Sequence, residues 1–286
     1  NTNGPNQALS RMSPTSPDDE RLQKVLANAG LGSRREIEQW IREGRLRING
    51  RLARLGDRVG DADVIKLDGR PLSPKRLARG PRQVVIYNKP EGEIVARSDP
   101  EGRPTVFERL PRPAHGRWIS VGRLDVNTSG LLILTTDGEL ANRLMHPSHQ
   151  IEREYAVRVF GEVSDSQLQR LVTGVDLDDG PARFEEITPA GGEGINRWFH
   201  VVLMEGRKRE VRRLWEAAGL TVSRLKRVRF GPVILDSAVK VGRWRELTAE
   251  ERQRLVAEAG LKDDQSPVSK KITAPRPRPG RRRRPA

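Results

Sequence analysis

The sequence predicts an α+β protein with a small N-terminal domain and a larger domain built on a mixed, mostly antiparallel sheet. Three observations predict it. Residues 18–70 show two short helical patterns followed by short strands, residues 71–82 combine proline with charge, and residues 83–262 mix apolar strands with amphipathic helices. The last range is long enough to bury a hydrophobic core of its own.

The small domain opens with helix signals and continues with strand signals. The second helix begins at Ser33, which has the capping-box spacing to Glu36. Residues 45–48 then alternate between polar and apolar, and Asn49-Gly50 is a hairpin turn signal. Two helices packed on a small sheet are therefore expected, and residues 71–82 are expected to form a linker to the next domain.

The larger domain alternates between strand and helix patterns. Strands are predicted over 84–87, 131–135, 155–160, 199–204 and 223–228, and helices over 137–145, 164–172, 209–218 and 248–258. Thr248 and Glu251 again have capping-box spacing.

Composition narrows the function. The 286 residues carry 53 Lys and Arg against 38 Asp and Glu, a net charge of +15, which suits a polyanionic partner such as a nucleic acid. There is no cysteine, so thiolate nucleophiles and thiolate-bound metals are excluded, and the four histidines show no metal-ligand spacing. Apolar runs are too short for a membrane span and no export signal is visible, so we expect a cytoplasmic protein.

Both ends are expected to be disordered, over residues 1–17 and 263–286. The last 22 residues contain eight Lys or Arg and no acid, which is +8 of the +15. We expect this tail to act as an electrostatic tether for nucleic-acid phosphates.

The small domain resembles the S4 RNA-binding module. The resemblance rests on residues 21–26, on Gly30, on Ser33-Arg34-Arg35, on Gly44-Arg45 and on Ile48-Asn49-Gly50. It implies an RNA-binding face made of Lys24, Arg34, Arg35, Arg45 and Arg47. The alternative is that these side chains form an ordinary solvated surface. Contacts of this kind position an RNA without reading its bases.

The most informative segment is the polar loop 122–130, Gly-Arg-Leu-Asp-Val-Asn-Thr-Ser-Gly, which precedes the apolar strand 131–134. It places the carboxylate of Asp125 close to the guanidinium of Arg123. By residue type alone, Asp125 is a nucleophile or base, or else an ordinary turn or cap residue.

The loop resembles the catalytic loop of the pseudouridine synthases, and residues 134–140 resemble the branch of that family that carries an S4 domain. The resemblance implies that Asp125 is the essential catalytic residue. The family reaction detaches uracil from C1′ of a uridine, rotates it and rejoins it through C5. No cofactor or metal is implied. Asp125 either attacks carbon or removes a sugar proton.

Two further segments carry the resemblance. The Arg153-Glu154-Tyr155 segment implies that Tyr155 stacks on the target base and is a candidate to take the C5 proton. A phenol with a pKa near 10 is a poor base, so stacking is the simpler role, and a tyrosine merely packed in a strand is the alternative. Residues 205–215 imply an arginine that pairs with Asp125: Arg212 matches the motif best, and Arg213 is the alternative.

Three remaining cations have two interpretations each. Arg123 either fills the gap left by the displaced uridine or closes the loop with a salt bridge. Arg207 and Lys208 either contact phosphates or lie in solvent.

The resemblance implies uridine isomerisation in ribosomal RNA. We expect the 23S RNA or a large-subunit assembly intermediate as partner, a monomer, and no membrane association. Two alternatives are the same reaction on 16S RNA and an RNA-binding assembly factor without catalysis.

Overall fold

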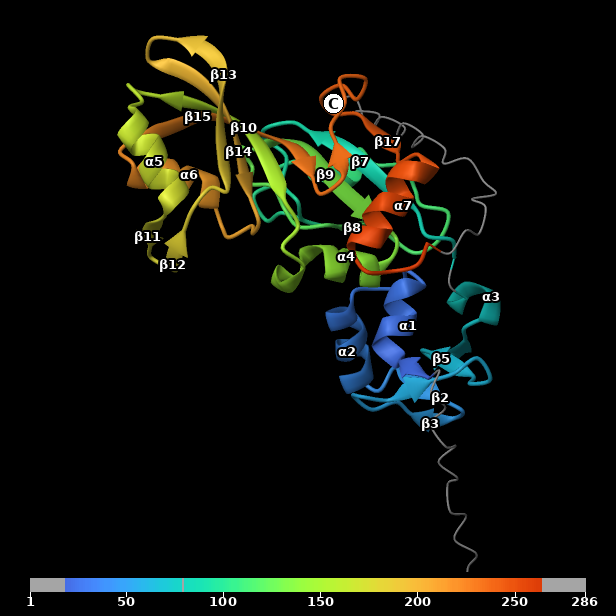
Figure 1. Cartoon of the computed structure of the whole chain (residues 1–286). Coiled ribbons are helices and arrows are strands. Elements are labelled where there is room, and N and C mark those ends of the chain that lie inside the picture. The colour runs from blue at the N-terminus through green and yellow to red at the C-terminus, as the bar shows by residue number, and fades with distance from the viewer. Residues whose placement is uncertain (1–18, 79, 264–286) are drawn as a thin grey trace, which may run out of the picture. The chain divides into compact units, whose positions relative to one another are not determined.

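The computed structural model describes residues 19–78 and 80–263 and divides into two compact units, one ending at Gly80 and one beginning at Pro81 (Figure 1). The predicted disordered N-terminus lies outside the described residues, as does the basic tail apart from Asp263. Each unit is described separately.

The described part of the first unit contains two sheets and three helices. Its elements are β1 (Glu20–Arg21), α1 (Leu22–Asn28), α2 (Arg34–Arg42), β2 (Leu46–Ile48), β3 (Arg51–Leu52), β4 (Arg58–Val59), β5 (Ile65–Leu67), β6 (Arg70–Pro71) and α3 (Pro74–Leu77). One sheet has the order β3-β2-β5-β6 and the other pairs β1 with β4, all antiparallel. Apolar side chains of α1, α2, β2, β4 and β5 form one core.

Local signals in this unit are confirmed. Ser33 and Glu36 form a reciprocal capping box at the start of α2. Asn49 and Gly50 both have positive φ, at 50° and 88°, as the tight turn between β2 and β3 requires.

Residues 71–82 are not an extended linker throughout. They contain α3, and the apolar side chains of Leu72 and Leu77 pack against the core of the first unit. The partial burial of Leu72 and Leu77 therefore holds the part of this stretch from 72 to 77 against the first unit.

The second unit is built on a nine-stranded sheet. Its elements are β7 (Val84–Lys89), η1 (Val106–Glu108), β8 (Ile119–Ser120), β9 (Ser129–Thr135), α4 (Gly138–Met145), η2 (Pro147–His149), β10 (Arg153–Phe160), α5 (Asp165–Thr173), β11 (Val175–Leu177), β12 (Gly180–Ala182), β13 (Glu186–Glu193), β14 (Asn196–Leu203), α6 (Glu210–Ala217), β15 (Thr221–Phe230), β16 (Val233–Ile234), β17 (Trp244–Glu246) and α7 (Ala249–Glu258). The strand order is β13-β14-β10-β15-β9-β7-β17, with β16 on β15 and β8 on β9.

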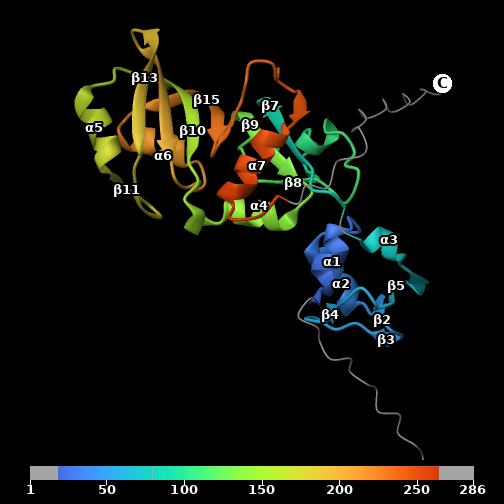
Figure 2. The same ribbon diagram turned by 45° about the vertical axis from the view of Figure 1, so that its right-hand side comes forward.

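The helices cover the two halves of this sheet differently. Helices α5 and α6 lie against the half that contains β13 and β15, and α4 and α7 lie against the half that contains β7 and β9 (Figures 1 and 2). Along β7, Val85 and Tyr87 enter the core shared with α5 and α6, whereas Val84 and Ile86 enter the core shared with α4 and α7. The middle of the sheet is therefore buried on both faces and is a rigid base for the loops at its edge.

The two halves meet where β9 and β15 run parallel for two residue pairs, Ser129 with Lys226 and Gly130 with Arg227. A Cβ on Gly130 would lie 2.2 Å from the carbonyl oxygen of Arg227, and its φ is +103°. Only glycine fits here, because both the conformation and the close backbone approach exclude a side chain.

The predicted fold class is confirmed, because nearly all strand pairs are antiparallel and β9–β15 is the parallel one among the described strands. Strand β13 was not predicted: its side chains are almost all exposed, so it lacks the apolar alternation that marks a half-buried strand. Across residues 19–78 and 80–263, we find no helix with the length and apolarity needed to traverse a bilayer.

Candidate active site

Asp125 lies in the loop between β8 and β9, and its carboxylate is exposed. The side chain of Lys89 anchors the loop by hydrogen bonds. Lys89 is the last residue of β7 and is 0% exposed. Its Nζ donates to the carbonyls of Pro90 at 2.9 Å, Asp125 at 3.1 Å and Thr128 at 2.8 Å. Burial lowers the pKa of Lys89 to about 8. The ammonium group thus binds two carbonyls of the loop and the carbonyl of Pro90, which follows β7.

Arg212 holds the same loop from α6. Its two terminal nitrogens donate to the carbonyl of Asn127 at 2.9 Å and to that of Val222 at 3.0 Å. Among the described residues it forms no ion pair with Asp125, contrary to the sequence-based expectation, because both nitrogens are directed at backbone oxygens. Asp125 is nevertheless near enough to favour the charged guanidinium, whose pKa is lowered mainly by burial. Arg212 therefore acts on the loop backbone.

Arg213 does not approach Asp125. It forms a two-point ion pair with Asp179, at 2.8 and 2.9 Å. Arg207 is also committed within the protein, since it pairs with Asp179 and with Glu210 and donates to the carbonyl of Pro181 at 2.6 Å. The guanidinium groups of Arg207 and Arg213 are therefore engaged by acids of the protein itself, and Arg213 does not pair with Asp125.

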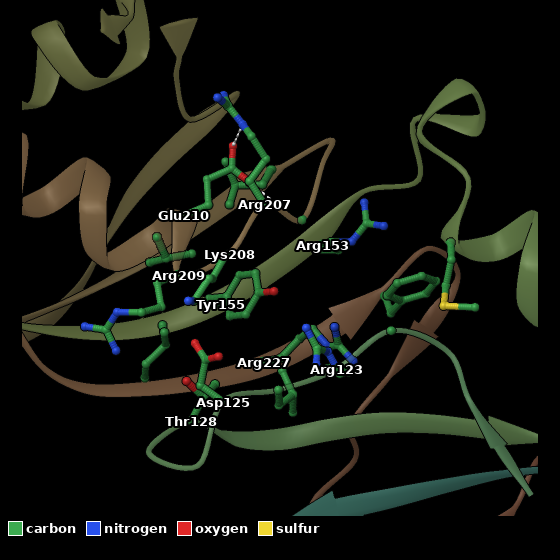
Figure 3. Close-up of a pocket in the computed structure, with 18 of the residues that line it drawn as sticks. Arg123, Asp125, Thr128, Arg153, Tyr155, Arg207, Lys208, Arg209, Glu210 and Arg227 are labelled. Atoms are coloured by element: carbon green, nitrogen blue, oxygen red, sulfur yellow. Dashed lines mark hydrogen bonds and ion pairs between the residues drawn. The ribbon is translucent and has the colours of Figure 1, made fainter. Parts of the chain in front are cut away.

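The loop opens into a pocket of about 530 Å³. Tyr155 of β10 lines it and is 8% exposed, with the Arg227 residue of β15 as its cross-strand neighbour. In Figure 3 the carboxylate of Asp125 points up from the loop toward the side on which Tyr155 and Lys208 lie, while Arg207 and Glu210 pair with each other farther away. The structure thus brings Asp125 and Tyr155 into one cavity, and Arg212 is hydrogen-bonded to the backbone of the loop.

Two predicted cations of the pocket remain available. Arg123 and Lys208 are exposed, line the pocket, and form no ion pair or hydrogen bond with any residue in the described ranges. The interpretation of Arg123 as a loop-closing salt bridge is therefore not supported by the described part of the chain.

The five predicted RNA-binding cations of the first unit differ in the contacts that they make within the protein. Arg34 and Arg35 are exposed in the first turn of α2. Arg45 pairs with Asp68 at 2.8 Å and lies over the ring of Trp40. Lys24 pairs with Glu20 at 3.2 Å, and Arg47 donates to the carbonyl of Gly50 at 2.9 Å.

Sequence reasoning missed the roles of Lys89 and Arg227. Arg227 is 2% exposed and donates through Nε to the carbonyl of Leu131. The available signal for Lys89 was a lysine only two positions after the all-apolar run 84–87. The sequence offers no comparable signal for Arg227, because this residue is one of several cations in a strand where polar and apolar residues alternate. Within residues 19–78 and 80–263, no three acidic or histidine side chains gather as a metal site.

Comparison with known proteins shows the family of this chain. Residues 83–217 match the RNA pseudouridylate synthase family model, and residues 20–65 match the S4 domain model. A protein of Vibrio cholerae named ribosomal large subunit pseudouridine synthase B is 61% identical over 229 residues, which are 80% of this chain and 71% of that protein. The chain belongs to the RNA pseudouridylate synthase family.

Further relatives agree with this family membership. Proteins of the same name from Escherichia coli K12 and Pseudomonas aeruginosa are each 60% identical, over 80% and 87% of this chain. The match spans 79% of the Escherichia coli protein and 65% of the Pseudomonas aeruginosa protein. A crystal structure described as pseudouridylate synthase superposes with a TM-score of 0.58 at 28% identity, covering 82% of this chain and 99% of that one.

Proposed function

We propose that this RNA pseudouridine synthase converts a uridine of large-subunit ribosomal RNA to pseudouridine, with Asp125 as the catalytic carboxylate. The observation that carries the proposal is the exposed Asp125 carboxylate, fixed through its loop by Lys89 and Arg212 and open to the pocket that Tyr155 lines. The name shared by the relatives supports the choice of RNA.

The reaction rearranges bonds within one nucleotide. The bond from C1′ to N1 breaks, the uracil turns, and a bond from C1′ to C5 forms. C5 then loses its proton and N1 gains one. Asp125 either adds to the sugar carbon or removes a sugar proton, and it needs a fixed position for both routes. Tyr155 supplies a flat apolar wall against which the free base stacks.

Arg123 and Lys208 have roles in handling the RNA. Arg123 precedes the catalytic residue by two positions and is exposed, so it can enter the stack in place of the displaced uridine. Lys208 offers an exposed ammonium to a phosphate at the pocket.

The first unit supplies further RNA contacts. Arg34 and Arg35 are its two exposed predicted cations on one helix turn. We propose residues 18–70 as the RNA-binding domain and 83–262 as the catalytic domain, a division supported by the boundary between Gly80 and Pro81.

Pseudouridine mapping of both ribosomal RNAs tests the function. A deletion strain is complemented with the wild type, with Asp125→Asn, or with Asp176→Asn, an exposed aspartate on β11 outside the pocket. We expect one 23S pseudouridine to be lost with Asp125→Asn and kept with Asp176→Asn, while RNA binding persists in both. A missing 16S pseudouridine would move the substrate to the small subunit, and modification by Asp125→Asn would contradict the mechanism.

A further inference from the structure

We propose that the pocket contains a phosphate subsite, in which Arg153, assisted by the charge of Arg227, holds the RNA phosphodiester next to the reacting uridine. This rests on the proposed function, because the phosphate belongs to the same RNA. In Figure 3, Asp125 and Lys208 lie toward one end of the pocket and Arg153 toward the other. The base and its adjoining backbone can therefore occupy different ends.

Arg153 is held in place before any ligand arrives. Its Nη1 donates to the carbonyls of Ile151 at 2.7 Å and Met204 at 3.0 Å. Its guanidinium carbon lies 5.1 Å from the ring centroid of Phe230, and that of Arg227 lies 5.3 Å from the same ring. Two guanidinium groups thus share one aromatic ring, and their positions are fixed by backbone and ring contacts.

Neither guanidinium forms an ion pair within the described residues, although the charges of Glu205 and Glu210 act on Arg153 from a distance. Within the described ranges no carboxylate pairs with Arg153 or Arg227, and the buried Nη2 of Arg227 has no hydrogen-bond partner. Burial lowers the pKa of Arg153, and the charge of Arg227 lowers it further. By contrast, the similarly buried Arg82 pairs with Asp137 and Asp263. Arg227 is buried and Arg153 is half-buried, and because a buried cation without an ion-pair partner is costly, an anion is favoured beside them.

The chemistry of the subsite selects a phosphodiester. Every nucleotide of an RNA brings one such anion on either side of its ribose, at a spacing fixed by the chain. The Nη1 atom of Arg153 is engaged by carbonyls, which leaves its Nε and Nη2 hydrogens as the pair of parallel donors that suits two phosphate oxygens. A base without charge would leave both guanidinium groups uncompensated.

The test removes either partner of the contact and then both. Short substrate RNAs carry one uncharged methylphosphonate, either 5′ or 3′ of the target uridine, and are assayed with wild type and Arg153→Gln. We expect Arg153→Gln to raise KM about 10- to 100-fold, more than it lowers kcat, and to reduce the slope of log affinity against log salt by about 1. One of the two methylphosphonates should raise KM for the wild type and have little further effect on the variant.

Two control variants separate this role from a structural one. Arg158→Gln removes an arginine from the same strand, whose Nε bonds Ser223 outside the pocket, and should behave as wild type with all three RNAs. Arg153→Lys keeps the charge and should recover part of the KM and of the methylphosphonate effect. If Arg153→Gln fails to fold, the comparison is made with Arg153→Lys instead.

The outcomes distinguish the subsite from the proposed function. Additive effects of Arg153→Gln and both methylphosphonates, with an unchanged salt slope, would overturn the phosphate subsite while pseudouridine still forms. Absence of pseudouridine with the wild type and unmodified RNA would instead overturn the proposed function.

Discussion

The buried ammonium of Lys89 donates a hydrogen bond to the backbone carbonyl of Asp125, at 3.1 Å. The protein therefore positions Asp125, the proposed catalytic residue, through the main chain and leaves its side-chain oxygens exposed. The same nitrogen also donates to the carbonyl of Thr128 in this loop and to that of Pro90, which follows β7. One buried side chain thus fixes the loop.

Replacing Lys89 with Met should lower both stability and activity. The three carbonyls would lose their donors, and we expect the free energy of unfolding to fall by roughly 2–4 kcal/mol, with a larger than tenfold loss of kcat. Urea unfolding and single-turnover assays measure the two effects. Lys240→Met, at an exposed lysine that bonds one carbonyl, should change neither. A fully active Lys89→Met enzyme would show that the loop needs no such anchor.

Activity should fall as the pH rises through about 8, the pKa of Lys89 in the folded protein. Above that pH a neutral amine donates at most two hydrogens to three acceptors. Stability should change in the opposite sense: the unfolded lysine keeps its proton to about pH 10.4, so the unfolded state binds more protons in this window and unfolding becomes less favourable as pH rises.

The variant Lys89→Arg separates the titration of Lys89 from any effect of pH on the RNA. Single-turnover rates from about pH 6 to about pH 10 are compared for wild type and Lys89→Arg, whose guanidinium keeps its charge throughout. The alkaline loss should disappear or shift in Lys89→Arg. The same loss in both proteins would assign it to the RNA.

Arg212→Gln should lower kcat by about 100-fold with a smaller change in KM, because it releases Asn127 and with it the loop that carries Asp125. Arg213→Gln is the matched control. It breaks a partly exposed ion pair with Asp179, so it should cost about 1 kcal/mol of stability and little activity. Steady-state kinetics of both variants decide. A larger loss of kcat in Arg213→Gln than in Arg212→Gln would contradict the role of Arg212 in holding the loop.

Gly130→Ala should be strongly destabilising, by about 3 kcal/mol or more, because the new methyl group would overlap the backbone of Arg227 and the residue has positive φ. Gly191→Ala is a control with φ of +96° and no atom within 4 Å of the added Cβ, so it should cost only about 1 kcal/mol. Thermal or urea unfolding compares them. Equal losses would show that close packing at the junction of β9 and β15 is unimportant.

The sequence alone predicted the features that depend on local signals. The capping boxes at Ser33 and Thr248 and the turn at Asn49-Gly50 formed as expected, because each is stabilised within a few residues of chain. The family was also identified from sequence, because the loop around Asp125 and the helix around Arg212 keep recognisable order and spacing.

Contacts between distant segments were decided only by the tertiary structure. Whether Arg212 reaches the side chain of Asp125 or the carbonyl of Asn127 depends on how α6 packs against the loop, 85 positions away in sequence. Likewise, nothing local shows that Arg153 and Arg227 share the ring of Phe230 without an acid beside them, because cross-strand register brings them together. The sequence by itself determined the family and pointed to Asp125 as the candidate catalytic residue. Packing determined which cations hold the loop and which keep no partner within the described residues, because a guanidinium finds its partner through space.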